Sequence, residues 1–502
     1  MKKLNIFLLG FVIAVLSGCT YSFPEPETPS SGEADFSKVV VVGNSLSAGF
    51  MDGALYDAGQ AASYANIVAM QMQAVGGGGF NQPDIKSPIG NFGYSGTTPL
   101  GHLILRNPLS PAPAPIVPGD PFNTTYDGDK AALNNLAVPG MRVVDAEVSG
   151  YGGSFGNPYF ARFASSPTTS VLNDAIAADG SFIIFWLGGN DALGYATSGA
   201  TGSSEGDGSP GNDMTSASVF DQAYKSAIAK LITDNGKKGI LANVPSVSDI
   251  PYFTTIPINS IPMDEATAAA TNAAFAGLNA ALEGLKNPVF GLDADDLDAR
   301  MVVYYEGNNP VTMHDSKLVD LGPYYDMLEG QGVIDAVQRA GLEPFRQSRP
   351  MTNNDLVTLP AAAVLGTESI PGNPASIIGV GAPLAEQYSL TLADRELIAD
   401  RIATFNATIK SVADGSNGNI ALIDINSIFA DFAQNGVVIN AGSMDASLFP
   451  PFGAFSLDGV HPNQRGSAYV ASLFIDQINA AFGSNIPNIN PNDWPGNALP
   501  IP

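Results

Sequence analysis

The sequence predicts an α/β fold in which a mainly parallel central sheet lies between two layers of helices, a three-layer α/β/α arrangement with large loop insertions. Several short runs consist almost wholly of apolar residues, a pattern typical of parallel strands that are buried on both faces. Between these runs lie longer segments whose apolar residues recur at spacings of three and four, which indicates amphipathic helices. Alternation of the two patterns along the chain is typical of a doubly wound sheet.

The expected strands and helices follow one another through most of the chain. Strands are expected at Val39–Val42, Phe182–Leu187, Gly239–Val244, Met301–Tyr305 and Ile420–Ile425. Helices are expected at Ser63–Val75, Ala217–Asn235, Asp264–Lys286, Thr391–Ala413 and Gln464–Phe482. Ligands of such sheets bind outside the carboxyl ends of the strands, so the residues that follow the strands are the candidates for a functional site.

The length of the chain, 502 residues, exceeds what one hydrophobic core usually supports, so it requires two domains or one domain with insertions. Because strand and helix patterns alternate through most of the chain, we expect one domain over residues 36–483. Segments with little periodicity suggest insertions near 76–130, 194–212 and 254–387, where loops of such length usually cover or shape a site. Residues 484–502 form a tail rich in Pro and Asn that we expect to pack irregularly or to stay mobile.

The first residues have the features of an export signal. Two lysines precede an apolar stretch, Ile6–Leu16, that is too short for a comfortable membrane span. The stretch ends in Leu-Ser-Gly-Cys19, which resembles the lipobox of bacterial lipoproteins, although an ordinary signal peptide can also contain a cysteine. We therefore expect residues 1–18 to be a lipoprotein signal peptide, Cys19 to be lipidated and residues 19–35 to form a disordered tether. Thr20 is compatible with sorting to the outer membrane of a Gram-negative bacterium, so the expected location is the cell envelope.

The charge of the chain limits its partners. There are 48 acidic and 22 basic residues, which gives a net charge of −26 at pH 7. Binding to nucleic acid needs clusters of Lys and Arg that release counterions, so no nucleic-acid partner is expected. The same charge disfavours direct adsorption to anionic lipid, and no later segment is long and apolar enough to span a bilayer. We expect a monomer that contacts the membrane through its lipid anchor alone.

A serine and a histidine at opposite ends of the chain suggest nucleophilic chemistry. Ser45 follows the apolar run Val39–Val42, and Asp458 precedes His461 by three residues. A serine hydroxyl is a poor nucleophile until an imidazole accepts its proton, and that imidazole needs a carboxylate to orient it. We expect these roles to fall to Ser45 as the nucleophile, His461 as the general base and Asp458 as the carboxylate that orients His461.

Other residues offer the same chemistry with weaker support. His314 is the rival base, but it lies inside an expected insertion and follows no strand, and His102 is expected to be structural. The loops Gly152–Gly156 and Gly202–Gly206 match Gly-x-Ser-x-Gly, the pattern around the nucleophilic serine of α/β-hydrolases. That motif works between a strand and a helix, and both loops lack these neighbours, so flexible turns are expected there.

Two further segments offer hydrogen-bond donors for a negatively charged intermediate, which such catalysis requires. Gly140 lies in a tight turn after Asn135, where glycine allows close approach of the backbone. Asn190 follows the expected strand Phe182–Leu187 and carries a side-chain amide.

The four segments together resemble the SGNH (GDSL-like) hydrolase family. The matching blocks are Gly-Asn-Ser45-Leu-Ser, the glycine Gly140, Gly-Gly-Asn190-Asp and Asp458-Gly-Val-His461-Pro, in the order of that family. The resemblance implies a flavodoxin-like sheet, a Ser45–His461–Asp458 triad, and an oxyanion hole made of the Ser45 and Gly140 N–H groups and the Asn190 side chain. Asn44 is a departure, because the family name has Asp at this place.

The expected function is that of a serine esterase or lipase that hydrolyses carboxylic esters through an acyl-enzyme intermediate. The substrate is a small-molecule, lipid or acylated-glycan ester; a lipid would require an apolar groove, which the insertions are candidates to form. The alternatives are a carbohydrate deacetylase of the same fold and a non-catalytic surface lipoprotein that binds a partner. No cofactor is expected.

No metal is expected either. Three histidines and no free thiol do not make a usual zinc site. The acidic run Asp293–Asp298 lacks the glycine and glutamate of an EF-hand calcium loop, so a solvated turn is expected there.

Overall fold

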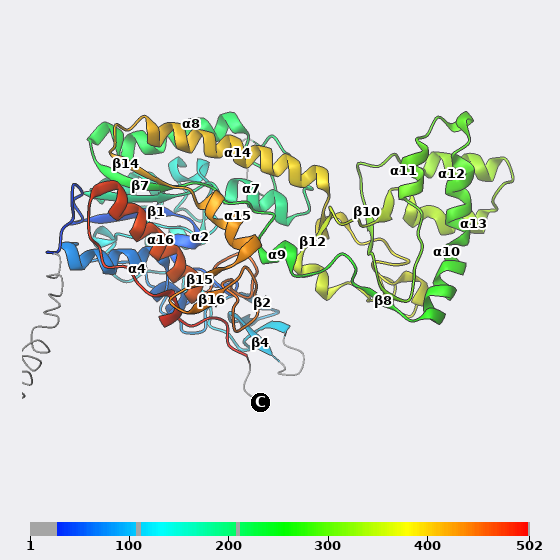
Figure 1. Ribbon diagram of the computed structural model, residues 1–502, viewed down its shortest axis with the longest axis horizontal. Helices are drawn as coiled ribbons and strands as arrows, with labels where there is room; N and C mark the ends of the chain where they lie inside the picture. Colours follow the sequence, from blue (N-terminus) through cyan, green and yellow to red (C-terminus); the bar gives the residue numbers. More distant parts are fainter. Residues whose placement is uncertain (1–27, 107–111, 207–210, 500–502) are drawn as a thin grey trace, which may run out of the picture.

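The computed structural model describes residues 28–106, 112–206 and 211–499 (Figure 1). Its centre is a sheet of four parallel strands in the order β1-β6-β7-β14. The strands are β1 (Val39–Gly43), β6 (Phe182–Trp186), β7 (Lys238–Ala242) and β14 (Ile420–Ile423). The predicted α/β class and four of the five predicted strands are confirmed.

The fifth predicted strand, Met301–Tyr305, is wrong. These residues form no strand, and side chains of a helix satisfy their backbone groups instead. The Asn279 amide bonds both backbone groups of Val302 at 2.8 and 3.0 Å, and the Asn272 amide bonds both of Tyr304 at 2.8 Å. The buried side chains of Val302 and Tyr304 explain why the segment has the composition of a strand.

An extended segment, residues 134–138, continues the sheet beyond β1. Val41 donates its N–H to Asn134 O at 2.8 Å, Leu136 donates to Val41 O at 2.9 Å, and Val138 donates to Gly43 O at 2.9 Å. If this segment is counted as the second strand in the chain, the spatial order is 2-1-3-4-5. The direction of winding then reverses between β1 and β6, the place where open α/β sheets bind their ligands.

Helices pack against both faces of the sheet, because successive side chains of a strand point to opposite sides. Val40, Ile183 and Leu241 belong to one hydrophobic core, and Val41, Ile184 and Ile240 belong to the other. The first core includes α6 (Val171–Ala177), α8 (Ala217–Leu231) and α14 (Leu392–Asp414), and the second includes α4 (Tyr64–Met72) and α16 (Gln464–Phe482). The predicted helices therefore exist within a few residues of their expected bounds.

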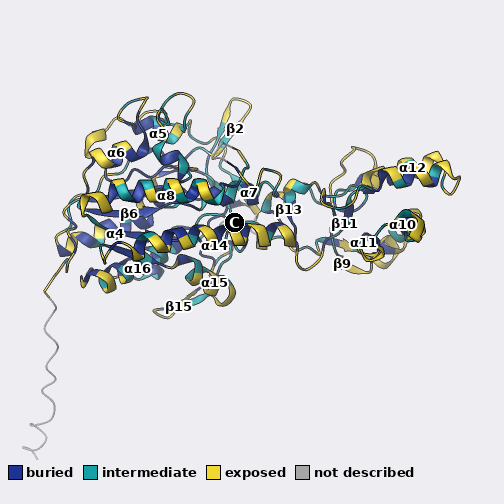
Figure 2. Cartoon of the chain, turned by 90° about the horizontal axis from the view of Figure 1, so that it is seen from above, coloured by how far each residue is buried: buried dark blue, intermediate teal, exposed yellow. Residues whose placement is uncertain are grey.

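Most of the expected insertion at 254–387 forms a helical lobe with a hydrophobic core of its own, and it projects from one end of the molecule (Figures 1 and 2). Its helices are α10 (Glu265–Leu285), α11 (Ala294–Ala299), α12 (Gly322–Gly330) and α13 (Ala336–Leu342). Its short strands are β8 (Ile261–Met263), β9 (Gly307–Asn309), β10 (Thr312–His314) and β11 (Ser348–Pro350). The lobe joins the rest of the protein through α9 (Pro251–Thr254) and the pairing of β12 (Leu356–Val357) with β13 (Ser389–Leu390).

The remaining elements are short. The region 76–130 contains two hairpins, β2 (Gly93–Ser95) with β3 (Thr98–Leu100) and β4 (Leu103–Arg106) with β5 (Ala112–Pro115). Near the carboxyl end of the chain, α15 (Ile425–Asn435) is followed by the hairpin of β15 (Val437–Ile439) and β16 (Gly442–Met444). The other helices are α2 (Ser45–Ala48), α3 (Asp57–Ala61), α5 (Pro158–Phe163) and α7 (Asn190–Thr197).

The two ends of the described chain lie against the domain. Glu33 donates its N–H to Phe482 O at 2.8 Å, and the Asn485 amide donates to Thr28 O at 2.9 Å. The expected disordered tether is therefore corrected for residues 28–35, which pack beside the end of α16. The signal peptide, residues 1–18, and Cys19 lie outside the described residues. The tail packs irregularly, for example through bonds from the Asn497 amide to Leu448 O and Phe455 O, both at 2.7 Å.

The described part of the chain contains helices of up to 23 residues. None of them combines the length and the apolar character that crossing a membrane requires.

Candidate active site

The candidate nucleophile lies at the turn from β1 into α2. Asn44 caps this short helix by accepting a hydrogen bond from Leu46 N at 3.1 Å, a role that Asn and Asp share. The turn needs glycine at position 43, because a Cβ there would collide with the Ser47 hydroxyl. Ser45 is the first helical residue and its side chain lies at the carboxyl end of β1.

His461 and Asp458 meet Ser45 across more than four hundred residues of sequence. The Nε2 atom of His461 lies 2.8 Å from Ser45 Oγ, and its Nδ1 atom lies 3.0 Å from Asp458 Oδ2. The side chains of His461 and Asp458 are 12 and 13% exposed, so solvent screens their interaction little. The structure therefore brings the three predicted triad residues together in hydrogen-bonding order.

Asp458 is held in its ionised form. Burial opposes ionisation, but His461 lowers the pKa of Asp458 through its charge and through the bond from its ring. The N–H groups of His461 and Val460, each 2.9 Å from Oδ1, lower it further, and the resulting pKa is about 2. A carboxylate at this place accepts the Nδ1 proton of the imidazole. The opposite nitrogen, Nε2, then faces the serine as an acceptor.

A second buried carboxylate, Asp52, ties the serine segment to the histidine segment. The backbone N–H of Asp52 donates to Ser456 Oγ at 3.0 Å, and Asp52 Oδ1 accepts from Leu457 N at 2.8 Å. The next residue, Gly53, donates its N–H to Asp458 Oδ2 at 2.9 Å. These three bonds fix Asp458 relative to the loop that follows Ser45.

The environment of Asp52 opposes its charge. Burial raises the pKa of Asp52 to about 6, and the nearby charge of Asp458 adds to the rise, although bonds from Leu457 N and the Tyr56 hydroxyl lower it. Asp52 is not recognisable from the sequence, because a single aspartate seven positions after a serine matches no motif. Its role depends on contacts with residues about 400 positions away.

Three candidate donors lie at this carboxyl edge of the sheet. Val138 N bonds Gly43 O at 2.9 Å, which places the Gly140 turn beside the end of β1, and Gly140 has a left-handed φ of +81°. Within the described part of the chain, the Gly140 N–H has no backbone acceptor. Ser45 is the first residue of α2, and the N–H group of a first helical residue has no acceptor inside the helix. The Asn190 amide donates one hydrogen to Met141 O at 3.0 Å, and an amide carries two.

Asp191 stabilises the segment that follows the Gly140 turn. It is fully buried, and its Oδ2 atom accepts the Val143 N–H at 3.0 Å, which joins the Gly140 turn to the start of α7. Burial raises the pKa of Asp191 to about 7, against the effect of the Val143 bond. Asp191 thus contacts the turn and does not replace the cap at Asn44.

The rival residues have other roles. His314 lies on β10 in the helical lobe, and the His102 ring bonds Ile89 O at 2.7 Å and stacks on Tyr56 at 4.2 Å between centroids. Ser154 is exposed and Ser204 is partly exposed, and both serines of the Gly-x-Ser-x-Gly loops lie in turns.

The described ranges contain His, Asp and Glu side chains, which are common ligands of metal ions. No group of three or more His, Cys, Asp or Glu side chains in these ranges is placed to hold a metal ion. In the acidic run, Asp293 caps α11 by accepting a bond from Asp295 N at 2.9 Å.

The junction of the helical lobe with the sheet domain contacts the loop that carries Asp458 and His461. Tyr252, in α9, donates its N–H to Gly459 O at 2.8 Å. A Cβ at Gly459 would lie 2.9 Å from Tyr252 N and 3.1 Å from Leu359 Cδ2, so the junction packs tightly on the loop that carries Asp458 and His461.

No protein-family model matches the chain, and no curated protein sequence matches it. Inference about its function therefore depends on the geometry of the site.

Proposed function

We propose that this protein is a serine hydrolase that cleaves carboxylic esters through an acyl-enzyme intermediate. The observation that supports this most is the chain of hydrogen bonds from Ser45 through His461 to Asp458, at 2.8 and 3.0 Å. A serine, an imidazole and a carboxylate in this order are the parts that activate a hydroxyl group.

The reaction proceeds in two halves. His461 accepts the proton of Ser45 as its oxygen attacks the ester carbonyl, and the N–H groups of Ser45, Gly140 and Asn190 stabilise the oxyanion. The intermediate collapses, the bond to the alcohol breaks, and His461 donates the proton to the leaving oxygen. Water then attacks the acyl-enzyme with His461 again as the base, and the carboxylic acid leaves. Asp458 stabilises the imidazolium form in both halves.

We also infer membership of the SGNH family and its three-layer, flavodoxin-like α/β/α fold. The two hydrophobic cores on opposite faces of the sheet support three layers, and the strand order 2-1-3-4-5 supports the flavodoxin-like winding. The four motif blocks support the family, since all of them lie at the carboxyl edge of this sheet.

For the cell, we propose a lipoprotein of the envelope that Cys19 anchors to the outer membrane. Thr28 lies beside the end of α16, at the edge where the strands begin, whereas Ser45 lies at the opposite, carboxyl edge. This arrangement favours an ester that reaches the site from the side away from the anchor.

The test is hydrolysis of p-nitrophenyl esters by the wild-type protein, Ser45→Ala and His461→Ala. Each variant is expected to lower kcat by about ten-thousandfold or more, because triad members act as a unit. Ser154→Ala, in an exposed Gly-x-Ser-x-Gly loop, is the matched control and keeps full activity. Activity that survives Ser45→Ala, or no activity on any ester, acetylated sugars included, rejects the proposal.

A further inference from the structure

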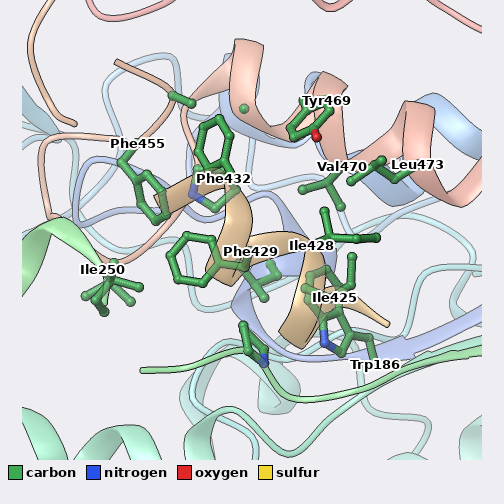
Figure 3. A pocket seen from close by; sticks show the side chains of 16 residues that line it. Trp186, Ile250, Ile425, Ile428, Phe429, Phe432, Phe455, Tyr469, Val470 and Leu473 are labelled. Atoms are coloured by element: carbon green, nitrogen blue, oxygen red, sulfur yellow. The ribbon is translucent and has the colours of Figure 1, made fainter. Parts of the chain in front are cut away.

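Chain neighbours of the candidate triad help to line an apolar cavity of about 120 Å³. Figure 3 shows the side chains of its wall. The cavity is bounded by α15, by α16 and by the loops that follow β7 and precede α16. None of the residues that line it in the described structure carries a charge, and aromatic rings from both α15 and α16 reach its wall. The expectation that the Pro- and Gly-rich insertions form the apolar groove is not met here, since the end of the chain supplies most of the wall.

Three chain neighbours of the catalytic residues line the cavity. Leu46, which follows Ser45 in α2, lines the cavity from one side. Val460 and Pro462, the two neighbours of His461 in the chain, line it as well. A group bonded to an ester carbonyl at Ser45 therefore has an apolar space within reach.

Helix α15 presents one face to the cavity. Ile425, Ile428, Phe429 and Phe432 have the spacing of a helical stripe, and all four line the wall. Ile428 and Phe429 remain partly exposed, whereas apolar side chains that only stabilise a core are usually covered. The start of the helix is fixed, because Asn426 N bonds Asn243 Oδ1 at 2.8 Å and the Asn426 amide bonds Val244 O at 2.9 Å.

We propose that this cavity, the acyl pocket, binds the acyl chain of the substrate and selects aliphatic chains of about six carbons. The proposal rests on the proposed function, since it places the chain of the acyl-enzyme at Ser45. The volume of the acyl pocket supports a chain of about six carbons, because an apolar cavity of about 150 Å³ stays dry and binds benzene, a molecule of six carbons. An acetyl group leaves such a pocket empty, so the substrate class is medium-chain acyl esters rather than acetylated sugars.

The first test is a series of p-nitrophenyl esters from acetate to decanoate. The expected kcat/KM rises about fourfold for each methylene, equivalent to about 0.8 kcal/mol, and stops rising near hexanoate. A preference for acetate, or a rise that continues unchanged to decanoate, overturns the proposal. A dependence on the alkyl length of acetate esters, with none on acyl length, assigns the pocket to the alcohol and also overturns it.

Two variants connect this preference to the pocket. Val470→Phe fills space next to α16, and the ratio of kcat/KM for hexanoate over acetate is expected to fall at least tenfold. Ala481→Phe places the same ring at an exposed position of that helix and is expected to keep the ratio. Phe429→Ala enlarges the pocket and is expected to move the preferred acyl-chain length towards octanoate. This variant tests the acyl pocket if Val470→Phe does not fold. An unchanged ratio and optimum in both variants overturn the proposal.

A binding measurement separates this proposal from the catalytic one. Trp186 lines the pocket, so sodium hexanoate added to Ser45→Ala is expected to change tryptophan fluorescence in a saturable way, more weakly when Val470→Phe is also present. Binding of hexanoate without hydrolysis of any ester rejects the proposed function and leaves the acyl pocket standing. Ser45-dependent hydrolysis without hexanoate binding or chain-length preference rejects the pocket and leaves the function standing.

Discussion

Replacing Asp52 by asparagine tests whether the loop behind the triad contains an unfavourable buried charge. Burial raises the pKa of Asp52 from its ordinary value of 3.8 to about 6. A carboxyl whose pKa is higher in the folded state stabilises that state fully below pH 3.8, and this stabilisation is lost as the pH rises through 6. The difference of about two pKa units corresponds to about 3 kcal/mol of unfolding free energy.

Asparagine preserves the local hydrogen bonds of this site. Its Oδ1 atom can accept the Leu457 N–H, and its amide can donate to the Tyr56 hydroxyl, which now donates to Asp52. The change therefore removes the charge and retains the shape. We expect the stability of Asp52→Asn relative to the wild type to increase by about 2 kcal/mol between pH 4 and pH 8.

The assay is urea unfolding at several pH values, followed by tryptophan fluorescence. The chain has two tryptophans, Trp186 in β6 and Trp494 in the tail, and both belong to the sheet domain, so the signal does not come from the helical lobe. Asp234→Asn, at an exposed position, controls for the loss of one negative charge. If Asp52→Asn and the wild type differ by the same free energy at pH 4 and pH 8, the reasoning about the buried charge is refuted.

Two further outcomes follow from the site and from the start of the chain. Asn190→Ala is expected to lower kcat about 100- to 1000-fold with little change in KM, because its amide acts on the oxyanion and not on the bound ester; a loss confined to KM would contradict this. Asn173→Ala, on the surface helix α6, is its control. Cys19→Ser is expected to move the protein from the membrane fraction to the soluble fraction with esterase activity retained, and fractionation with an activity assay checks both; a variant that stays with the membranes argues against the lipid anchor.

Local patterns in the sequence determined the parts of the fold and of the site that neighbouring residues encode. Continuous apolar runs identified β1, β6, β7 and β14, since a strand covered on both faces excludes polar side chains. Asp458 and His461 were also identified locally, because they are three positions apart and their hydrogen bond spans a single turn of the chain.

The same local reasoning failed where a distant residue decides the structure. Met301–Tyr305 has the composition of a strand, but Asn272 and Asn279 of α10 satisfy its backbone. Residues 28–35 have the composition of a tether, but they find partners beside Phe482 and Asn485. In both cases the contact that decides the structure comes from a distant residue, whereas composition and periodicity describe only neighbouring residues.

What the sequence by itself determined is the set of chemical groups: a serine after a strand, a base with its carboxylate, and two candidate oxyanion donors. Only the tertiary structure decided that His461 lies 2.8 Å from Ser45, that Asp52 joins their two loops, and that α15 and α16 enclose an apolar space beside them. The physical reason is that these contacts join segments hundreds of residues apart. Packing, rather than any local preference of the chain, fixes their distances.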